Sequence, residues 1–375
     1  MTNAMKTNAT RVLAFVGSID RASPYFSGPR GQGISVLAFD PASGVLTLLS
    51  QTVGADNPTF VAIGAAGPTL YATSEVWGWH EGVVTAYRID PATGHLSYIN
   101  KQPTRGSITA QASLHPDGHW LLVANYRMGE DGLRPPQAAV VLPIEADGGL
   151  GAVADSVAHH GAGPDAARQD GPHPHCAVPS PDGRHVLVAD LGTDDIVVYR
   201  FDAESGRLTL AGAHAMPPGT GPRHLLFTPS GRHVVVTGEL NNTVTALAWQ
   251  DGHLRPVSTV STLPAGWQGE SHAADIQVAP DGRYVYAANR GHDSIAVLAL
   301  DAAGTLTAVA HQPTRRTPRS FALDPSGGCV LVAAQDDHDL SVFRRDAATG
   351  ALSGPVARLD IGSPLCVRLA AFPAA

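Results

Sequence analysis

The stretch that decides the fold is HCAVPSPDGRHVLVADLGTDDIVVYRFDAESGRLTLAG, residues 175–212. It holds four short apolar runs, separated by polar residues and by a Pro-Asp-Gly turn at 181–183. Runs of this length, rich in valine and isoleucine and bounded by glycine, proline or aspartate, are typical of β-strands. The stretch is therefore predicted to form a unit of four short strands joined by tight turns.

The same unit recurs along the chain. Copies begin at or near Thr59, Thr109, His175, Arg223, Ala273 and Arg319. The second of these carries an insertion around RMGEDGLRPPQ, residues 127–137. Each unit spans about 40–50 residues, which is the size of a four-stranded propeller blade.

The two ends of the chain complete the count of blades. A further copy, which begins with RVLAFVGSID at 11–20, lacks its innermost strand, and SPLCVRLAAF at 363–372 is a spare strand after the last complete unit. Pairing the two would leave no open edge. We expect an all-β, seven-bladed β-propeller with one blade closed by N- and C-terminal strands. Residues 11–375 would form this single domain after a disordered N-terminus at 1–10, and the alternative is two unrelated β-sandwiches.

Composition restricts the partners of the protein. Charged residues make up 15% of the chain, whereas 40 glycines and 29 prolines supply many turns, a balance that favours β-structure. The net charge of -8 argues against a nucleic-acid surface, which would be basic. The start of the chain has no apolar stretch long enough for export, and no run elsewhere is long enough to span a membrane. We expect a soluble cytoplasmic protein, monomeric or weakly homo-oligomeric, that binds neither membrane nor nucleic acid.

Superposing the repeats singles out one rim of the propeller as a candidate site. In each blade, the start of the first strand and the end of the second strand lie on the same face. A purely structural repeat would reuse the same small residue there, but charged and polar residues occupy these places and differ between blades. At the start of the first strand stand His175, Arg223 and Arg319, and at the end of the second stand Tyr126, Leu191, Glu239, Arg290 and Gln335.

The type of these residues suggests the ligand. The turn at 229–231 brings Arg223 and Glu239 alongside each other, either as a structural ion pair or as part of a site. Arg290 and Arg319 have no obvious neighbour in sequence that would neutralise them. Three arginines beside a histidine in an acidic protein favour a small anionic ligand, held by forked guanidinium hydrogen bonds.

His173 and His175 could be taken for a metal motif, because alternate residues of an extended chain point the same way. Pro174 separates them, however, and no third ligand stands at metal spacing. We therefore expect neither a metal ion nor another cofactor. His175 beside Glu239 is better interpreted as an acid or base, since the pKa of histidine lies near neutral pH.

Four stretches resemble a known family, the seven-bladed propeller lactonases. They are GPRH (221–224), GELNNTV (238–244), AADIQVAPDGRYVYAANR (273–290) and QPTRRTPRSFALDPSG (312–327). That family includes the bacterial propeller type of 6-phosphogluconolactonase and a fungal carboxymuconate cyclase. The resemblance implies catalytic roles for His175, Arg223, Glu239 and Arg290. Two segments depart from the 6-phosphogluconolactonase pattern, at Tyr25–Gln32 and at His159–His173, and both are expected to lie over the channel.

The expected reaction is metal-independent hydrolysis of a sugar lactone, with 6-phosphogluconolactone as the first choice of substrate. Glu239 or His175 would take a proton from water, while Arg223 and Arg290 would stabilise the oxyanion. The residues expected to bind the rest of the substrate are Tyr126, His173, His224, Arg319 and Gln335. The alternatives are a cyclase acting on an unsaturated dicarboxylate and a non-catalytic scaffold, for which an apolar rim would be expected.

Overall fold

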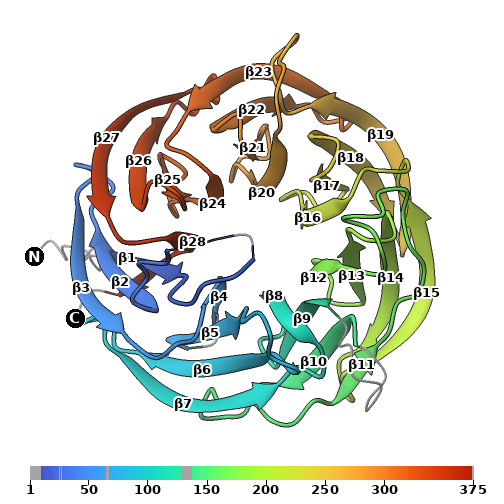
Figure 1. Ribbon diagram of the computed structural model, residues 1–375, viewed down its shortest axis with the longest axis horizontal. Coiled ribbons are helices and arrows are strands. Elements are labelled where there is room, and N and C mark those ends of the chain that lie inside the picture. The colour runs from blue at the N-terminus through green and yellow to red at the C-terminus, as the bar shows by residue number, and fades with distance from the viewer. Residues whose placement is uncertain (1–9, 25, 27, 65–66, 128–136, 374–375) are drawn as a thin grey trace, which may run out of the picture.

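Seven four-stranded antiparallel sheets stand in a ring around a central channel (Figure 1). The computed structural model describes residues 10–24, 26, 28–64, 67–127 and 137–373, and its regular elements there are all strands. This arrangement confirms the seven-bladed propeller, and the alternative of two β-sandwiches is wrong. None of the described residues belongs to a helix with the length and hydropathy needed to cross a bilayer.

The strands follow one another from the channel outwards in six of the blades. The first two of these six are β4 (Phe60–Ile63), β5 (Thr69–Ser74), β6 (Val83–Ile89) and β7 (Leu96–Pro103), then β8 (Ser107–Leu114), β9 (Trp120–Arg127), β10 (Ala139–Pro143) and β11 (Asp155–Val157). The next two are β12 (Pro174–Pro179), β13 (His185–Asp190), β14 (Asp195–Asp202) and β15 (Arg207–Ala215), then β16 (Pro222–Phe227), β17 (His233–Gly238), β18 (Thr243–Gln250) and β19 (His253–Ser261). The last two are β20 (His272–Val278), β21 (Tyr284–Arg290), β22 (Ser294–Leu300) and β23 (Leu306–Pro313), then β24 (Pro318–Leu323), β25 (Cys329–Ala334), β26 (Asp339–Arg345) and β27 (Leu352–Asp360).

The seventh blade is built from both ends of the chain. Its order is β28 (Pro364–Pro373), β1 (Thr10–Ser18), β2 (Ile34–Phe39) and β3 (Leu46–Thr52). The antiparallel register of β28 on β1 runs from Thr10 opposite Pro373 to Ser18 opposite Pro364. The predicted closure is therefore confirmed. Residues 1–9 of the expected disordered N-terminus lie outside the described residues, and Thr10 already belongs to β1.

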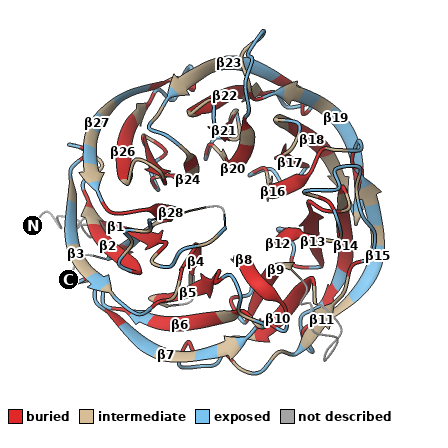
Figure 2. Cartoon of the chain, viewed as in Figure 1, coloured by how far each residue is buried: buried red, intermediate tan, exposed pale blue. Residues whose placement is uncertain are grey.

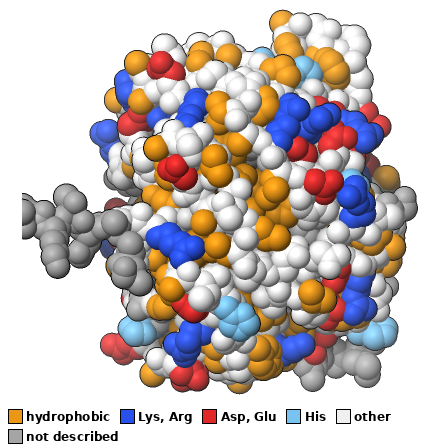
Figure 3. All heavy atoms as spheres, turned by 90° about the vertical axis from the view of Figure 1, so that its left-hand side faces the viewer, with side chains coloured by type: hydrophobic (Ala, Val, Ile, Leu, Met, Phe, Trp, Pro, Cys, Tyr) orange, Lys and Arg blue, Asp and Glu red, His pale blue; other side chains and the backbone are white. Residues whose placement is uncertain are grey.

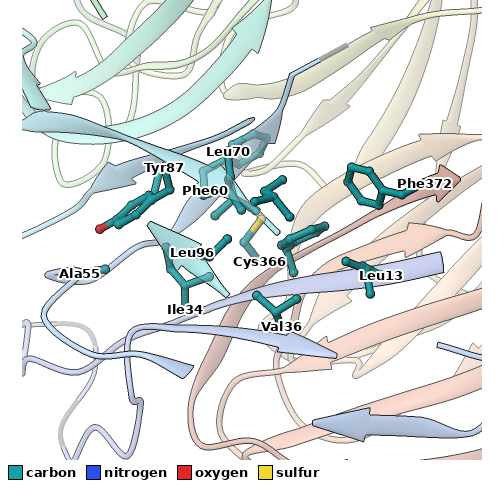
Figure 4. Close-up of a cluster of buried hydrophobic side chains, with 14 residues drawn as sticks. Leu13, Ile34, Val36, Ala55, Phe60, Leu70, Tyr87, Leu96, Cys366 and Phe372 are labelled. Carbon is teal, nitrogen blue, oxygen red and sulfur yellow. The ribbon is translucent and has the colours of Figure 1, made fainter. Parts of the chain in front are cut away.

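The hydrophobic core consists of layers between neighbouring blades. Figure 4 shows one layer, in which Leu13 and Val36 of the closing blade pack against Phe60 and Leu70 of the next. Second strands such as β13 and β17 are buried throughout, the innermost strands β12 and β16 are only half-buried at one end, and the outermost strands carry most of the exposed surface (Figure 2). On the side wall, acidic and basic side chains are interspersed with apolar ones (Figure 3). Each sheet buries both faces because it has a neighbour on either side, which explains the near-continuous apolar runs in the second and third strands.

The turns between first and second strands lie on the face opposite the candidate site. Gly183 ends one of them with a φ of 70°, a left-handed conformation that favours glycine. Its carbonyl oxygen accepts a hydrogen bond from His115 Nε2 of the preceding blade at 2.8 Å, and a Cβ at Gly183 would lie 2.7 Å from the same nitrogen. The Pro-Asp-Gly signal of the sequence thus marks a contact between blades as well as a reversal of the chain.

Candidate active site

A cavity of about 560 Å³ opens at one end of the channel, on the rim indicated by the sequence. Seven of the nine predicted side chains line it: Tyr126, His173, His175, Glu239, Arg290, Arg319 and Gln335. Arg223 and His224 lie deeper, at the neck of the channel. Further lining residues that the sequence analysis did not select include Glu75, Trp77, Arg127, Arg168, Asp170, His272 and Asp336.

β-Bulges at the start of two innermost strands determine the direction of two of these side chains. In β12 the register passes from Pro174 directly to Cys176, so His175 is an extra residue. Arg319 is the extra residue of β24 in the same way, between Pro318 and Ser320. Because a bulge redirects the side chain it carries, it can turn a residue of the inner strand towards the mouth of the channel.

Glu239 is the centre of charge in the site. One carboxylate oxygen accepts from Arg168 Nη2 at 2.5 Å, and the other lies 2.8 Å from Arg223 Nε and 3.0 Å from Arg290 Nη2. The side chain is only 5% exposed. Burial alone would raise the pKa of Glu239, but Arg290, Arg223 and Arg168 outweigh it and hold the pKa well below its usual range. The Arg223–Glu239 ion pair is thus present, and it forms part of a larger cluster.

His175 lies next to this cluster. Its ring makes edge-to-face contacts with Tyr126, at a centroid distance of 5.6 Å, and with His224 at 5.0 Å. Burial, together with Arg223 and His224, lowers its pKa well below the usual value, so the ring is neutral at pH 7. Its Nδ1 is buried and has no hydrogen-bond partner among the described residues. Because His175 also lines the cavity, its neutral imidazole can accept a proton from a ligand or a water molecule there.

The other two arginines each have an acidic partner from another blade. Arg290 is held by Glu239 and donates to the carbonyl of Ala273, while Arg319 lies 3.7 Å from Glu75. Glu75 directly follows β5, just as Glu239 directly follows β17. Glu75 thus occupies, in the blade that begins near Thr59, the position equivalent to that of Glu239. The repeat itself is the signal in the sequence that points to it.

The two long connections reach the cavity, as expected. Pro24 of the β1–β2 loop lines it, and this loop extends towards the centre of the ring (Figure 1), although residues 25 and 27 lie outside the described ones. The segment 159–173 supplies Arg168 and His173, whose ring stacks on Tyr126 at 4.6 Å. Both ring nitrogens of His173 are engaged, by the carbonyl of Tyr126 and by Asp170. No repeat pattern covers this loop, so nothing in the sequence pointed to Arg168.

Below the neck lies a second cavity of about 520 Å³, which opens on the opposite face. His224 lines this lower cavity and the neck, not the upper cavity. Its ring is bound to Asp275 rather than directed towards the predicted substrate position. His224 is therefore absent from the upper cavity, which the other residues predicted to bind substrate line, and it meets only Arg319 among them at the neck.

Comparison with known proteins agrees with this architecture. The model of a family described as lactonase, 7-bladed β-propeller, matches residues 14–369. The chain belongs to this family. It is similar to a 6-phosphogluconolactonase of Bacillus subtilis, with 32% identity over 96% of this chain and 98% of the relative. It is also similar to one of Formosa agariphila, with 31% identity over 90% and 94% of the two chains.

A solved structure gives the same picture in three dimensions. The periplasmic gluconolactonase of Pseudomonas aeruginosa superposes with a TM-score of 0.86 and 34% identity, covering 96% of this chain and 99% of that one. The likeness therefore includes all seven blades of the lactonase propeller. Within its described residues, this lactonase-family chain has no group of three or more His, Cys, Asp or Glu side chains arranged to hold a metal ion.

Proposed function

We propose that the protein hydrolyses a sugar lactone in the upper cavity, that 6-phosphogluconolactone is its preferred substrate, and that no metal ion takes part. Membership of the lactonase family and the names of the similar proteins support the reaction class. The observation that carries the proposal is the juxtaposition of neutral His175 with three arginines gathered on Glu239. This arrangement offers a base next to fixed positive charge, which ester hydrolysis requires.

The two candidate bases differ in how freely they can accept a proton. Glu239 is a poor base because three guanidinium groups stabilise its charged form. His175 is neutral and is the better choice, so Glu239 acts as the counter-ion that holds the arginines in place. In the first step, a water molecule gives a proton to His175 while the water oxygen bonds to the carbonyl carbon of the lactone. In the second step, the ring C–O bond breaks and the imidazolium returns the proton to the leaving oxygen, which yields the open hydroxy acid.

Arg290 and Arg223 stabilise the oxyanion that forms on the carbonyl oxygen in this mechanism. Arg290 is well suited because it lines the cavity and its side chain is 15% exposed, so that the guanidinium can meet a ligand. A charged donor binds an anion more strongly than a neutral group does. Each such donor contributes about 3 kcal/mol to the transition state.

The remaining lining residues bind the distal part of the substrate. Arg319, which stands two blades further along the ring than Glu239, is assigned to the phosphate. Gln335 lines the cavity, is held by a hydrogen bond from its Nε2 to Asp336, and is assigned to a sugar hydroxyl. The stacked rings of Tyr126 and His173 form a flat wall beside the sugar ring of the substrate.

The assignment of the two arginines is tested by comparing Arg290→Ala with Arg319→Ala in steady-state kinetics on 6-phosphogluconolactone. We expect Arg290→Ala to lower kcat by about 100-fold, because it removes a contact made to the developing charge. Arg319→Ala should mainly raise KM, because it binds a group that does not react. If Arg319→Ala leaves both constants unchanged, its role as the phosphate ligand is wrong.

A further inference from the structure

A chain of side chains crosses the neck of the channel and ends on the catalytic cluster. Asp275 Oδ1 lies 3.0 Å from His224 Nδ1, and His224 Nε2 lies 3.2 Å from Arg223 Nη1. Arg223 in turn contacts Glu239. Asp275, Arg223 and Glu239 are each at most 4% exposed, and His224 is 9% exposed. The reaction proposed above makes no use of Asp275 or His224, which lie on the far side of Arg223 from the cavity.

The chemistry of the chain fixes the protonation of His224. A guanidinium group can only donate, so Arg223 Nη1 must donate to His224 Nε2. The ring proton then sits on Nδ1 and is donated to the Asp275 carboxylate. Burial and the charge of Arg223 lower the pKa of His224 to about 4, so the ring is neutral and carries only this one proton at neutral pH.

Asp275 is itself held in one orientation. Its Oδ2 accepts from Ser320 Oγ at 2.8 Å and from Arg368 Nη1 at 3.3 Å, and the backbone N–H of Phe321 also points to it at 3.4 Å. Burial would raise its pKa, but Arg368 and the hydrogen bond from His224 hold the pKa well below the usual value. The carboxylate is therefore ionised and fixed when it meets His224.

We propose that Asp275 and His224 are positioning residues, which select the Nδ1–H tautomer of His224 and so give Nη1 of the catalytic Arg223 guanidinium an acceptor, in addition to the contact of its Nε with Glu239. This inference rests on the proposed function, because it assigns a role to residues that support the same site. A buried guanidinium without an acceptor on Nη1 would turn away from the oxyanion position to find one. The protonation of His224, which touches no substrate, thus sets the orientation of Arg223, which does.

The test is Asp275→Asn, which preserves the shape of the side chain. Two groups that can only donate, Arg368 and the Phe321 amide, face Oδ2, whereas one such group, the Ile276 amide, faces Oδ1. The new amide is therefore expected to keep its oxygen towards Arg368 and Phe321 and its NH2 towards His224. His224 Nδ1 must then accept, and its proton moves to Nε2, where it faces the Arg223 donor. We expect kcat to fall at least about tenfold with little change in KM, the pattern for a lost transition-state contact.

Two further variants separate this effect from a loss of structure. Ser320→Ala removes a hydrogen bond to the other oxygen of Asp275 without affecting the tautomer, and it should stay close to wild type in kcat. His224→Gln can still accept from Arg223 and donate to Asp275, whereas His224→Phe can do neither. We therefore expect His224→Gln to retain clearly more activity than His224→Phe at similar thermal stability.

The tautomer can be measured without any assay of activity. In the ¹⁵N spectrum of histidine-labelled protein, with His224→Gln used to assign the signal, wild-type His224 should show a protonated Nδ1 and a bare Nε2, and Asp275→Asn should reverse them. An Nε2–H tautomer in the wild type, or an active wild type whose kcat is unaffected by Asp275→Asn, would overturn the inference. A wild type that opens no lactone but shows the expected tautomers would instead contradict the proposed function.

Discussion

Glu239 owes its chemical character to partners from three separate parts of the chain. Arg223 comes from the first strand of its own blade, Arg290 from the next blade, and Arg168 from the long connection at 159–173. Three arginines at such short distances would repel one another in a buried site without the carboxylate. At the scale of the residue, Glu239 therefore makes the positively charged site possible, and removing its charge should affect stability as well as activity.

Replacing Glu239 with Gln is expected to lower the free energy of unfolding at pH 7 by roughly 3–5 kcal/mol, because it leaves buried guanidinium charges uncompensated. Urea unfolding measures this loss. The difference from wild type should shrink as the pH falls below about 4.5, because the unfolded chain then binds a proton that the folded Glu239 does not. The control is Glu75→Gln, because the Glu75 carboxylate lies 3.7 Å from Arg319. This variant should lose less of the free energy of unfolding. Equal losses in the two variants would contradict the central role of Glu239.

At the scale of the element, the sequence predicts where the strands and rim positions lie but not where every side chain points. The repeat placed His175, Arg319 and Glu239 correctly, since each occupies a fixed place relative to a turn or strand end. Arg223 and His224 show the limit. They are adjacent in a strand whose register shifts between Pro222 and Leu225, and only the folded structure shows that they face different ends of the channel. Arg168 lies in a loop outside the repeat, and its position depends entirely on tertiary contacts.

The connection at 159–173 is expected to act on substrate binding through Arg168. Arg168→Gln removes the charged contact with Glu239, and a charge-assisted hydrogen bond is worth about 1.5–3 kcal/mol. We therefore expect kcat/KM to fall about tenfold or more, mainly through KM, as measured in steady-state kinetics. Arg184→Gln carries the same substitution in a turn on the opposite face, where Arg184 pairs with Asp182, and should behave as wild type. A fall in kcat alone would mean that Arg168 belongs to the chemical step.

At the scale of the whole molecule, the ring has to be closed for the cavity to exist. The innermost strand of one blade is the last strand of the chain, and Cys366 and Val367 on it are fully buried. Pairing of β28 with β1 therefore joins the two ends of the chain and removes the exposed edge that β1 would otherwise present. Because all seven blades share one architecture, any of them could be the blade that the two ends of the chain complete.

A circular permutant tests that statement. Residues Thr10 and Pro373 are partners in the β1–β28 ladder, so a short glycine–serine linker can join these positions. New ends between Asp281 and Gly282, in the turn after β20, would make another blade close by the same device. We expect this permutant to keep one cooperative thermal transition, whereas truncation after Ile361 should abolish it. A truncated chain that unfolds like the full one would show that closure by β28 is dispensable.

The most direct test of the central claim is the rate of lactone opening by purified, EDTA-treated protein above the spontaneous rate. Freshly made 6-phosphogluconolactone and unphosphorylated gluconolactone are compared, with Arg290→Ala as the control. The account predicts fast opening that survives EDTA, favours the phosphorylated lactone and is lost in the variant. No acceleration of either lactone would contradict it and would leave the cyclase reaction on an unsaturated dicarboxylate as the next one to assay.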